Sequence, residues 1–362
     1  MSERVFALFS GGGTGGHTYP ALAVAQELVR RGHPRESLRF VGGRRGIEGR
    51  VVSEAGFGID LLAGRGLQRR FTVANLAAIG GAVWAFAHAL VLVRRHQPRI
   101  VVGFGGYASL PCVVAARVLR IPTLVHEQDA APGLANRIGV RLGAHAAVSL
   151  PATPLRNATL TGNPVRSVIA SIEREPAWDP ALVAVYGGAQ GARTINRAAI
   201  GCYDIWRHRD DMTVHHVCGP RNMVECQVSL DAQRQAGDAL VYQLVPYEPH
   251  MESLLARATL AVCRSGAGTI AELTVAGVPS VLVPLPGSPS DHQSRNAQTL
   301  EQTGAACVVR DDECNPARLD VVVSELLSEP DRLEQMGKAA RSIARPDAAR
   351  RVADLVDGYA RA

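Results

Sequence analysis

The sequence predicts an α/β protein with two parallel-sheet, Rossmann-like domains. Short apolar runs alternate with helix-like patterns along the whole chain, and a glycine-rich turn follows the first run in each half. Such alternation is typical of a parallel sheet whose strands are joined by right-handed helical crossovers. At 362 residues the chain is also longer than a single hydrophobic core usually supports, so two domains are expected.

In the first half, each apolar run of strand length ends close to a glycine or a polar turn. The run at 5–9 leads into GGGTGG, and residues 20–32 then have helical apolar spacing. The further strands expected in this half are residues 38–43, 99–106, 122–128 and 146–150.

A domain boundary is expected within residues 159–170, where Asn163–Pro164 interrupts regular structure. The pattern restarts with an apolar run and a glycine turn at 182–188, and strand-like runs follow at intervals typical of βαβ units. The expected division is an N-terminal domain at 1–162, a C-terminal domain at 163–342 and a final helix at 343–362. Whether that helix packs back on the N-terminal domain is left open.

Composition narrows the class of partner and compartment. The formal net charge of +6 and the pI of about 9.1 suit an anionic partner, namely a nucleotide, a pyrophosphate, an acidic membrane surface or nucleic acid, and they equally suit simple solubility. The seven cysteines form no CxxC pair, which predicts free thiols in a reducing compartment. The N-terminal apolar run is too short for a signal peptide.

One long apolar segment, residues 71–93, leaves three interpretations. It carries Trp84, Phe86, Leu90 and Leu92, with Arg69 and Arg70 before it and Arg94 and Arg95 after it. Aromatic side chains and flanking arginines favour a surface helix that dips into an anionic membrane. A partly buried helix and a membrane-spanning helix are the two alternatives.

The first glycine turn, GGGTGGH at 11–17, predicts an anion site at the start of a helix. Glycines let backbone N–H groups approach a phosphate, and the helix N-terminus adds a favourable partial charge. No acidic residue ends the next strand, which disfavours NAD, whereas Arg44 and Arg45 keep an NADP-dependent reductase as an alternative. His17 follows the turn directly and suits a general base, or a solvent-facing or capping histidine.

Further polar groups are expected at the carboxyl ends of strands, where open α/β sheets bind ligands. Glu127 and Asp129 follow one strand, and GGAQGA at 187–192 follows another as a second phosphate-type turn. Arg166 offers a cation for a diphosphate. Each carboxylate is equally compatible with an ordinary surface loop charge.

The segment CRSGAGTIAEL at 263–273 is the most informative. A small-residue loop after a strand leaves room for a ligand, and Glu272 in the early turns of the next helix can accept two ribose hydroxyls. An acidic helix start is the structural alternative. His292, Gln293 and Asn296 lie at a loop-to-helix junction and suit recognition of sugar hydroxyls. The sequence contains no GxSxG, HExxH, Walker A lysine or DxD pair. The key residues of α/β-hydrolases, zincins and P-loop proteins are therefore missing.

Taken together and in this order, these motifs resemble the MurG family of glycosyltransferases over nearly the whole chain. The segments that carry the resemblance are GGTGGH, GGYASLP, HEQ, GNPVR, GGAQGA, CRSGAGTIAE and DHQSRNA. The resemblance implies a GT-B fold with a cleft between two domains. It implies inverting transfer of GlcNAc from UDP-GlcNAc to the 4-hydroxyl of the MurNAc of lipid I, giving lipid II for peptidoglycan synthesis. It also implies a peripheral location at the cytoplasmic face of the membrane, with no nucleic-acid partner.

The same resemblance implies site residues. It places Thr14, Gly15 and Gly16 near the sugar or the acceptor diphosphate, and Val245 against the uracil through its backbone. The residues expected to hold UDP-GlcNAc are Arg166, Val245, Ala267, Gly268, Thr269, Ile270, Ala271, Glu272 and Gln293. Asp129, Asn136, Ala189, Gln190 and Asn296 complete the expected substrate-binding set.

Two positions depart from the family pattern. Asp129 stands where the family usually has Asn, and Ala189 stands where it usually has Ser, which removes an amide donor and a hydroxyl. We expect weaker donor binding from Ala189 rather than loss of activity. The expected base is His17, with Glu127 as the alternative or as its orienting partner. No metal is expected to be required, although loosely bound Mg²⁺ near the acceptor pyrophosphate is compatible with the sequence. A non-catalytic UDP-sugar-binding protein is the third hypothesis.

Overall fold

The computed structural model describes residues 5–13, 15–44, 46–62, 74–151 and 153–361. The chain forms two compact units, which are described separately below. The first contains Met1–Arg166 and Arg345–Ala362, and the second contains Ser167–Ala344. The division therefore falls four residues later than expected from Asn163–Pro164, and the C-terminal helix belongs to the first unit.

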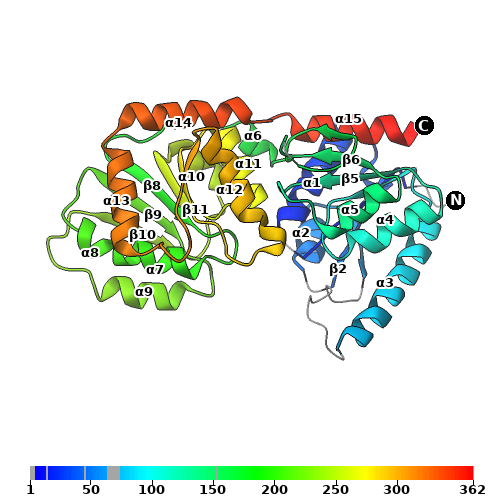
Figure 1. Cartoon of the computed structure of the whole chain (residues 1–362), viewed down its shortest axis with the longest axis horizontal. Helices are drawn as coiled ribbons and strands as arrows, with labels where there is room; N and C mark the ends of the chain where they lie inside the picture. Colours follow the sequence, from blue (N-terminus) through cyan, green and yellow to red (C-terminus); the bar gives the residue numbers. More distant parts are fainter. Residues whose placement is uncertain (1–4, 14, 45, 63–73, 152, 362) are drawn as a thin grey trace. The chain divides into compact units, whose positions relative to one another are not determined.

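The N-terminal unit is built on a seven-stranded parallel sheet (Figure 1). Its strands are β1 (Ala7–Ser10), β2 (Leu38–Gly43), β3 (Gly58–Leu62), β4 (Ile100–Gly103), β5 (Thr123–Glu127), β6 (His145–Val148) and β7 (Ala158–Leu160). They lie in the order β3-β2-β1-β4-β5-β6-β7. The strand order reverses between β1 and β4, so the loops after these two strands begin side by side.

Alternation along the strands divides the core of this unit into two layers. Phe9 packs with α1 (Gly15–Arg30), α2 (Glu48–Glu54) and α15 (Ala348–Arg361), whereas Leu8 packs with α3 (Ala74–His96) and α4 (Ser109–Val118). Successive side chains of a strand point to opposite faces, so a strand covered on both faces is apolar throughout. Helix α5 (Leu134–Arg141) packs against α4.

The last helix, α15, is fastened to α1 by polar contacts around Arg31. The guanidinium of Arg31 lies 3.0 Å from Asp357 and 2.9 Å from Asp354, and His33 lies 2.8 Å from Asp357. Apolar side chains of α15 also join the β1 layer of the core. The sequence leaves the docking of this helix open because its partners are more than 300 residues away.

The C-terminal unit repeats the architecture with six parallel strands (Figure 1). These are β8 (Ala181–Tyr186), β9 (Met212–Val217), β10 (Val241–Val245), β11 (Leu260–Cys263), β12 (Ser280–Leu282) and β13 (Ala306–Val308), in the order β10-β9-β8-β11-β12-β13. The order reverses between β8 and β11, which places the loops at 187–192 and 264–266 at one edge of the sheet.

Two groups of helices accompany this sheet. One core cluster joins β8 and β9 to α7 (Arg193–Gly201), α8 (Tyr203–Trp206), α9 (Met223–Asp231), α13 (Pro316–Leu327) and α14 (Pro330–Ile343). The remaining helices of the unit are α6 (Ser167–Ala170), α10 (Met251–Arg257), α11 (Ala267–Ala276) and α12 (His292–Gln302). Helix α11 packs against α6, α10, α12 and α14.

Helix α3 covers one face of the N-terminal sheet and also carries exposed apolar side chains. Leu92 is buried in the core and Phe86 and Leu90 are half-buried, whereas Trp84 is 51% exposed. Of these four side chains, Trp84 is therefore the one presented to solvent. Among the described residues, no helix is both long enough and apolar enough to cross a membrane. Arg69 and Arg70 lie outside the described residues.

Candidate active site

The two glycine loops of the N-terminal unit meet where the strand order reverses. The loop at 11–13 follows β1, and the loop at 104–108 follows the neighbouring strand β4. Gly106 has a φ of 76°, and a Cβ at this position would collide with the carbonyl oxygen of Gly12. Glycine is therefore required here both by backbone conformation and by close approach of the two loops.

His17 lies in the first turn of α1, beside both loops. Its Nδ1 atom lies 3.1 Å from the carbonyl oxygen of Gly12. A Cβ built on Gly105 would lie 3.2 Å from His17 Nε2 and 3.8 Å from Asn136 Nδ2, so both side chains border the same point of the β4 loop. Gly15 and Gly16 begin α1, and Thr14 lies outside the described residues.

A proton on Nδ1 of His17 donates to Gly12, which places the lone pair of the neutral ring on Nε2. A histidine whose second nitrogen is held by a hydrogen bond has a fixed tautomer. The arrangement is the one that a general base requires, with the basic atom turned toward the β4 loop.

Glu127 ends β5 and is only 3% exposed. Its Oε1 accepts a hydrogen bond from the backbone N–H of Asp129 at 3.1 Å, and its Oε2 accepts from Gly133 N–H and Asn136 Nδ2, each at 2.8 Å. Burial raises the pKa of the Glu127 carboxyl, and the bonds from Asn136, Gly133 and Asp129 oppose that shift. The carboxylate therefore organises its own loop, a role that was not among those expected for it from the sequence.

Two neighbours of Glu127, Asn136 and His126, are also buried and hydrogen-bonded to backbone carbonyls. Asn136 also donates to the carbonyl of His126 at 3.1 Å, while its Oδ1 is buried with no hydrogen-bond partner. His126 lies 3.0 Å from the carbonyl oxygen of Gly162, and burial lowers its pKa to about 4. His126 was not expected to have a structural role, because a histidine in the middle of an apolar run gives no signal for its partner.

In the C-terminal unit, the side-chain amide of Asn222 holds the phosphate-type turn after β8 by hydrogen bonds. Asn222 Nδ2 donates to the carbonyl of Gln190 at 3.0 Å and to that of Cys218 at 2.8 Å. Gly191 has a φ of 73°, and a Cβ there would collide with Cys218 O. Ala189 and Gln190 themselves are exposed at the tip of the turn. The tip of this turn therefore faces solvent, while the carbonyl of Gln190 is held by Asn222.

A buried histidine lies beneath the same turn. His216 Nε2 lies 3.0 Å from Asn196 Oδ1 and its Nδ1 lies 2.8 Å from the hydroxyl oxygen of Tyr242. Asn196 Nδ2 in turn donates to Cys218 O at 2.9 Å. Burial lowers the pKa of His216 to about 3, which keeps this ring neutral.

The loop after β11 is fixed by a different set of contacts. Arg264 is buried and pairs with Asp311 at 2.6 Å, and it donates to the carbonyls of Val283 and Pro284. Asp311 also accepts from the hydroxyl of Thr194 in α7 at 3.2 Å. These contacts link the loops after β11, β12 and β13 to the start of α7. Asp311 is not among the site residues expected from the sequence.

The expected sugar-reading residues divide into two kinds. Gln293 is half-buried, and its Oε1 accepts from Leu285 N–H at 3.0 Å, which leaves its NH₂ group for other partners. Asn296 is completely buried and donates to the carbonyl of Ser265 at 3.1 Å, while Ser265 donates to the carbonyl of Gln293 at 2.8 Å. Asn296 therefore supports the β11 loop.

The segment 267–272 forms the first turns of α11. Ala267, Gly268, Thr269, Ala271 and Glu272 are partly exposed, and the side chain of Ile270 is buried in the core. No heavy atom lies within 4 Å of a Cβ built on Gly268. This end of α11 is thus an open surface beside the β8 turn.

Three further expected residues lie elsewhere. Val245 ends β10, and its carbonyl accepts from Cys218 N–H at 3.0 Å. Arg166 is half-buried and belongs to the N-terminal unit, and Asp129 is half-buried in the loop organised by Glu127. Their contacts with substrate stay predictions.

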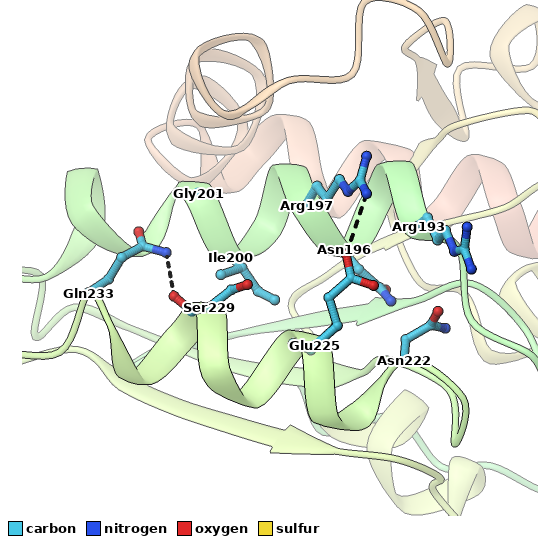
Figure 2. Close-up of a pocket in the computed structure, with 10 residues that line it drawn as sticks. Arg193, Asn196, Arg197, Ile200, Gly201, Asn222, Glu225, Ser229 and Gln233 are labelled. Carbon is cyan, nitrogen blue, oxygen red and sulfur yellow. Dashed lines mark hydrogen bonds and ion pairs between the residues drawn. The ribbon is translucent and has the colours of Figure 1, made fainter.

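One cavity of about 170 Å³ lies between α7 and α9 (Figure 2). Its polar walls bond to one another: Arg197 pairs with Glu225 at 3.4 Å and Gln233 donates to Ser229 O at 3.0 Å. None of the residues that line it belongs to the β8 turn at 187–192 or to the start of α11 at 267–272. Within the described part of the chain, no three His, Cys, Asp or Glu side chains are grouped to hold a metal ion. The expectation that no metal is required stays a prediction.

Two parallel-sheet units, each with glycine loops where its strand order reverses, are the architecture of GT-B proteins, and the comparisons with known proteins place this chain among the glycosyltransferases of that class. The structure of Acinetobacter baumannii MurG is similar, with a TM-score of 0.80 and 28% identity over 98% of this chain and 99% of that one. Models of the glycosyltransferase family 28 N-terminal and C-terminal domains match residues 7–148 and 182–352.

Curated relatives identify the particular family. The chain is 40% identical to a transferase of Solibacter usitatus over 98% of this chain and 96% of the relative. It is 38% identical to one of Desulforudis audaxviator over 98% of each chain. Both are named UDP-N-acetylglucosamine–N-acetylmuramyl-(pentapeptide) pyrophosphoryl-undecaprenol N-acetylglucosamine transferase. This chain belongs to that family, and neither the reductase nor the non-catalytic alternative has support.

Proposed function

We propose that this protein transfers GlcNAc from UDP-GlcNAc to the 4-hydroxyl of the MurNAc of lipid I, with inversion, and so forms lipid II. The observation that carries the proposal is the match over nearly the whole chain to transferases named for these two substrates. It is an N-acetylglucosaminyltransferase of peptidoglycan synthesis.

The proposed division of labour follows the two sets of loops. The loops after β1, β4 and β5 bind the acceptor, and His17 Nε2 takes the proton of the attacking hydroxyl. The loops after β8 and β11 bind the donor, with Glu272 accepting from the ribose hydroxyls and Gln293 contacting the sugar. Support comes from the fixed tautomer of His17 and the exposed start of α11.

The chemistry needs stabilisation of negative charge on the departing UDP. Backbone N–H groups of the β8 turn and of the first turn of α11 supply it, because the N-terminal end of a helix carries a partial positive charge. Arg166 adds a full charge in this proposal. Oriented donors of this kind stabilise a developing charge without reorganising during the reaction.

The protein is further proposed to work at an anionic membrane surface, peripherally and on the cytoplasmic side. Support comes from α3, where Trp84 and its apolar neighbours Val83 and Val91 are exposed and Arg94 and Arg95 follow in the last turn. Apolar and aromatic side chains beside cations suit the headgroup region of a bilayer.

The direct test supplies radiolabelled UDP-GlcNAc and a short-chain lipid I analogue to the purified protein. Label should move into a product with the mobility of lipid II, and UDP should appear in equal amount. Binding of UDP-GlcNAc without any transfer would contradict the proposed activity. Replacing the acceptor with water is the control for simple hydrolysis.

A further inference from the structure

Glu48, the first residue of α2, is a buried carboxylate that the site described above does not use. It is 2% exposed and lies between the β2 end and the first glycine loop. Its Oε1 accepts a hydrogen bond from the backbone N–H of Gly13, and its Oε2 is buried with no hydrogen-bond partner. A buried carboxylate is costly unless it is held by hydrogen bonds, so its position calls for a reason.

The space around Glu48 is shaped by glycines. A Cβ on Gly12 or Gly46 would overlap the carboxylate, and a Cβ on Gly42 would lie 2.9 Å from the Cβ of Glu48. Gly12 and Gly46 lie in the loops after β1 and β2, and Gly42 lies near the end of β2; together they leave room for the side chain of Glu48. Any side chain at these three glycine positions would clash with Glu48 where it now lies.

The peptide group that Glu48 contacts is the one that His17 contacts. The N–H of Gly13 and the carbonyl of Gly12 belong to a single planar peptide unit. Glu48 accepts a hydrogen bond from the N–H of Gly13, and the carbonyl oxygen of Gly12 lies 3.1 Å from His17 Nδ1. The peptide is thus held on one side by a carboxylate and on the other by the imidazole.

We propose that Glu48 is a positioning residue that acts on His17 through the Gly12–Gly13 peptide. By accepting from the N–H, the carboxylate fixes the plane of the peptide and directs its oxygen to His17 Nδ1. A negative charge at the N–H also polarises the peptide, which strengthens the hydrogen bond that its oxygen accepts. The imidazole is then held with its basic atom, Nε2, toward the acceptor loops.

This role resembles that of the carboxylate that orients the histidine of a Ser-His-Asp triad, with a peptide group inserted between them. It rests on the proposed function, because His17 is the base of that reaction. The contact itself does not depend on the reaction and can be measured separately.

The test compares Glu48→Gln and Glu48→Ala with Glu54→Ala. Glu54 is on the same helix, is exposed and pairs only with Arg50 in the described contacts, so it controls for loss of a carboxylate from α2. We expect Glu48→Ala to lower kcat by about 10- to 100-fold and Glu48→Gln by less, since the amide keeps one acceptor oxygen. The Kd for UDP should change less than about twofold, because donor binding uses the other unit.

The second measurement is ¹⁵N NMR of the histidine ring nitrogens, with His17 assigned by its loss in His17→Gln. His17 should be the Nδ1–H tautomer in the wild type and in Glu54→Ala. In Glu48→Ala it should be a mixture of the two neutral tautomers. An unchanged tautomer in a folded Glu48→Ala variant, or kcat equal to that of Glu54→Ala, would overturn the proposal. A melting curve shows whether Glu48→Ala has folded. If it has not, the kcat and the His17 tautomer of Glu48→Gln decide the proposal. Absence of transfer by the wild type would count against the proposed function, and the NMR result would still decide the contact.

Discussion

The Nδ2 atom of Asn136 donates to Oε2 of Glu127 at 2.8 Å, and this bond closes a loop in which the glutamate accepts three hydrogen bonds. A carboxylate so engaged would have to give up these bonds to take a proton from a substrate. His17 has its second nitrogen on a backbone carbonyl and its basic nitrogen toward the β4 loop. The geometry favours His17 over Glu127 as the base.

The first prediction separates these two residues. His17→Ala should lower kcat by about 10²- to 10⁴-fold, which is the usual contribution of a general base. Glu127→Gln keeps an acceptor oxygen for the loop and should lower kcat by less than His17→Ala does. The affinity for UDP should be unchanged in both variants, as measured by calorimetry. A Glu127→Gln enzyme as inactive as His17→Ala would return the role of base to the carboxylate.

The second prediction concerns the donor. Glu272→Ala should weaken UDP binding by about 1.5–3 kcal/mol, because charge-assisted hydrogen bonds to the ribose are lost. Glu301→Ala, which removes an exposed carboxylate from neighbouring α12, is the matched control. Calorimetry with UDP and a melting curve measure binding and folding separately. If both variants bind UDP equally well, Glu272 does not contact the nucleotide.

The third prediction concerns the membrane surface. Changing Val83, Trp84 and Val91 together to Ser should weaken binding to anionic vesicles without loss of UDP binding, because these side chains are exposed rather than packed in the core. The wild type should also be released as salt rises, since each cation near the surface contributes about 1 kcal/mol that salt screens. Sedimentation with vesicles at low and high salt measures both effects.

The matched control for that variant is Val224→Ser with Val228→Ser. These two valines are also exposed, but they lie on α9 of the C-terminal unit. The control should bind vesicles like the wild type. Equal weakening in both variants would mean that α3 has no special part in membrane binding.

The fourth prediction follows from the buried histidine beneath the β8 turn. The pKa of His216 is about 3 in the folded protein, whereas an unfolded histidine has a pKa of about 6.5. The unfolded chain therefore binds the extra proton first, and the free energy of unfolding falls as the pH drops below about 6.5. Between pH 7 and pH 5 this residue alone should cost about 2 kcal/mol.

Urea unfolding at pH 7 and pH 5 tests this dependence. His216→Gln cannot take up the proton, so its stability should change less between the two pH values than that of the wild type. His250→Gln removes an exposed histidine instead and should behave like the wild type. The same pH dependence in wild type and His216→Gln would show that other groups dominate acid unfolding.

Much of the strand pattern could be predicted from local sequence. The runs at 5–9, 38–43 and 182–188 correspond to β1, β2 and β8, because a strand buried on both faces is a continuous apolar run. Strands β3, β7 and β13 were not expected from the sequence. Both β7 and β13 have only three residues and β3 alternates in character, so their place in the sheets comes from pairing with neighbours.

The sequence by itself determined where glycine loops follow strands and which families of chemistry those loops suit. That information is local, since glycine, strand and helix start are adjacent in the chain. The tertiary structure alone decided what the polar side chains do. Glu48 reaches Gly13 across 35 residues, and Arg31 reaches Asp357 across 326. Such contacts depend on which strands become neighbours, and a hydrogen bond formed through space leaves no periodic trace in the sequence.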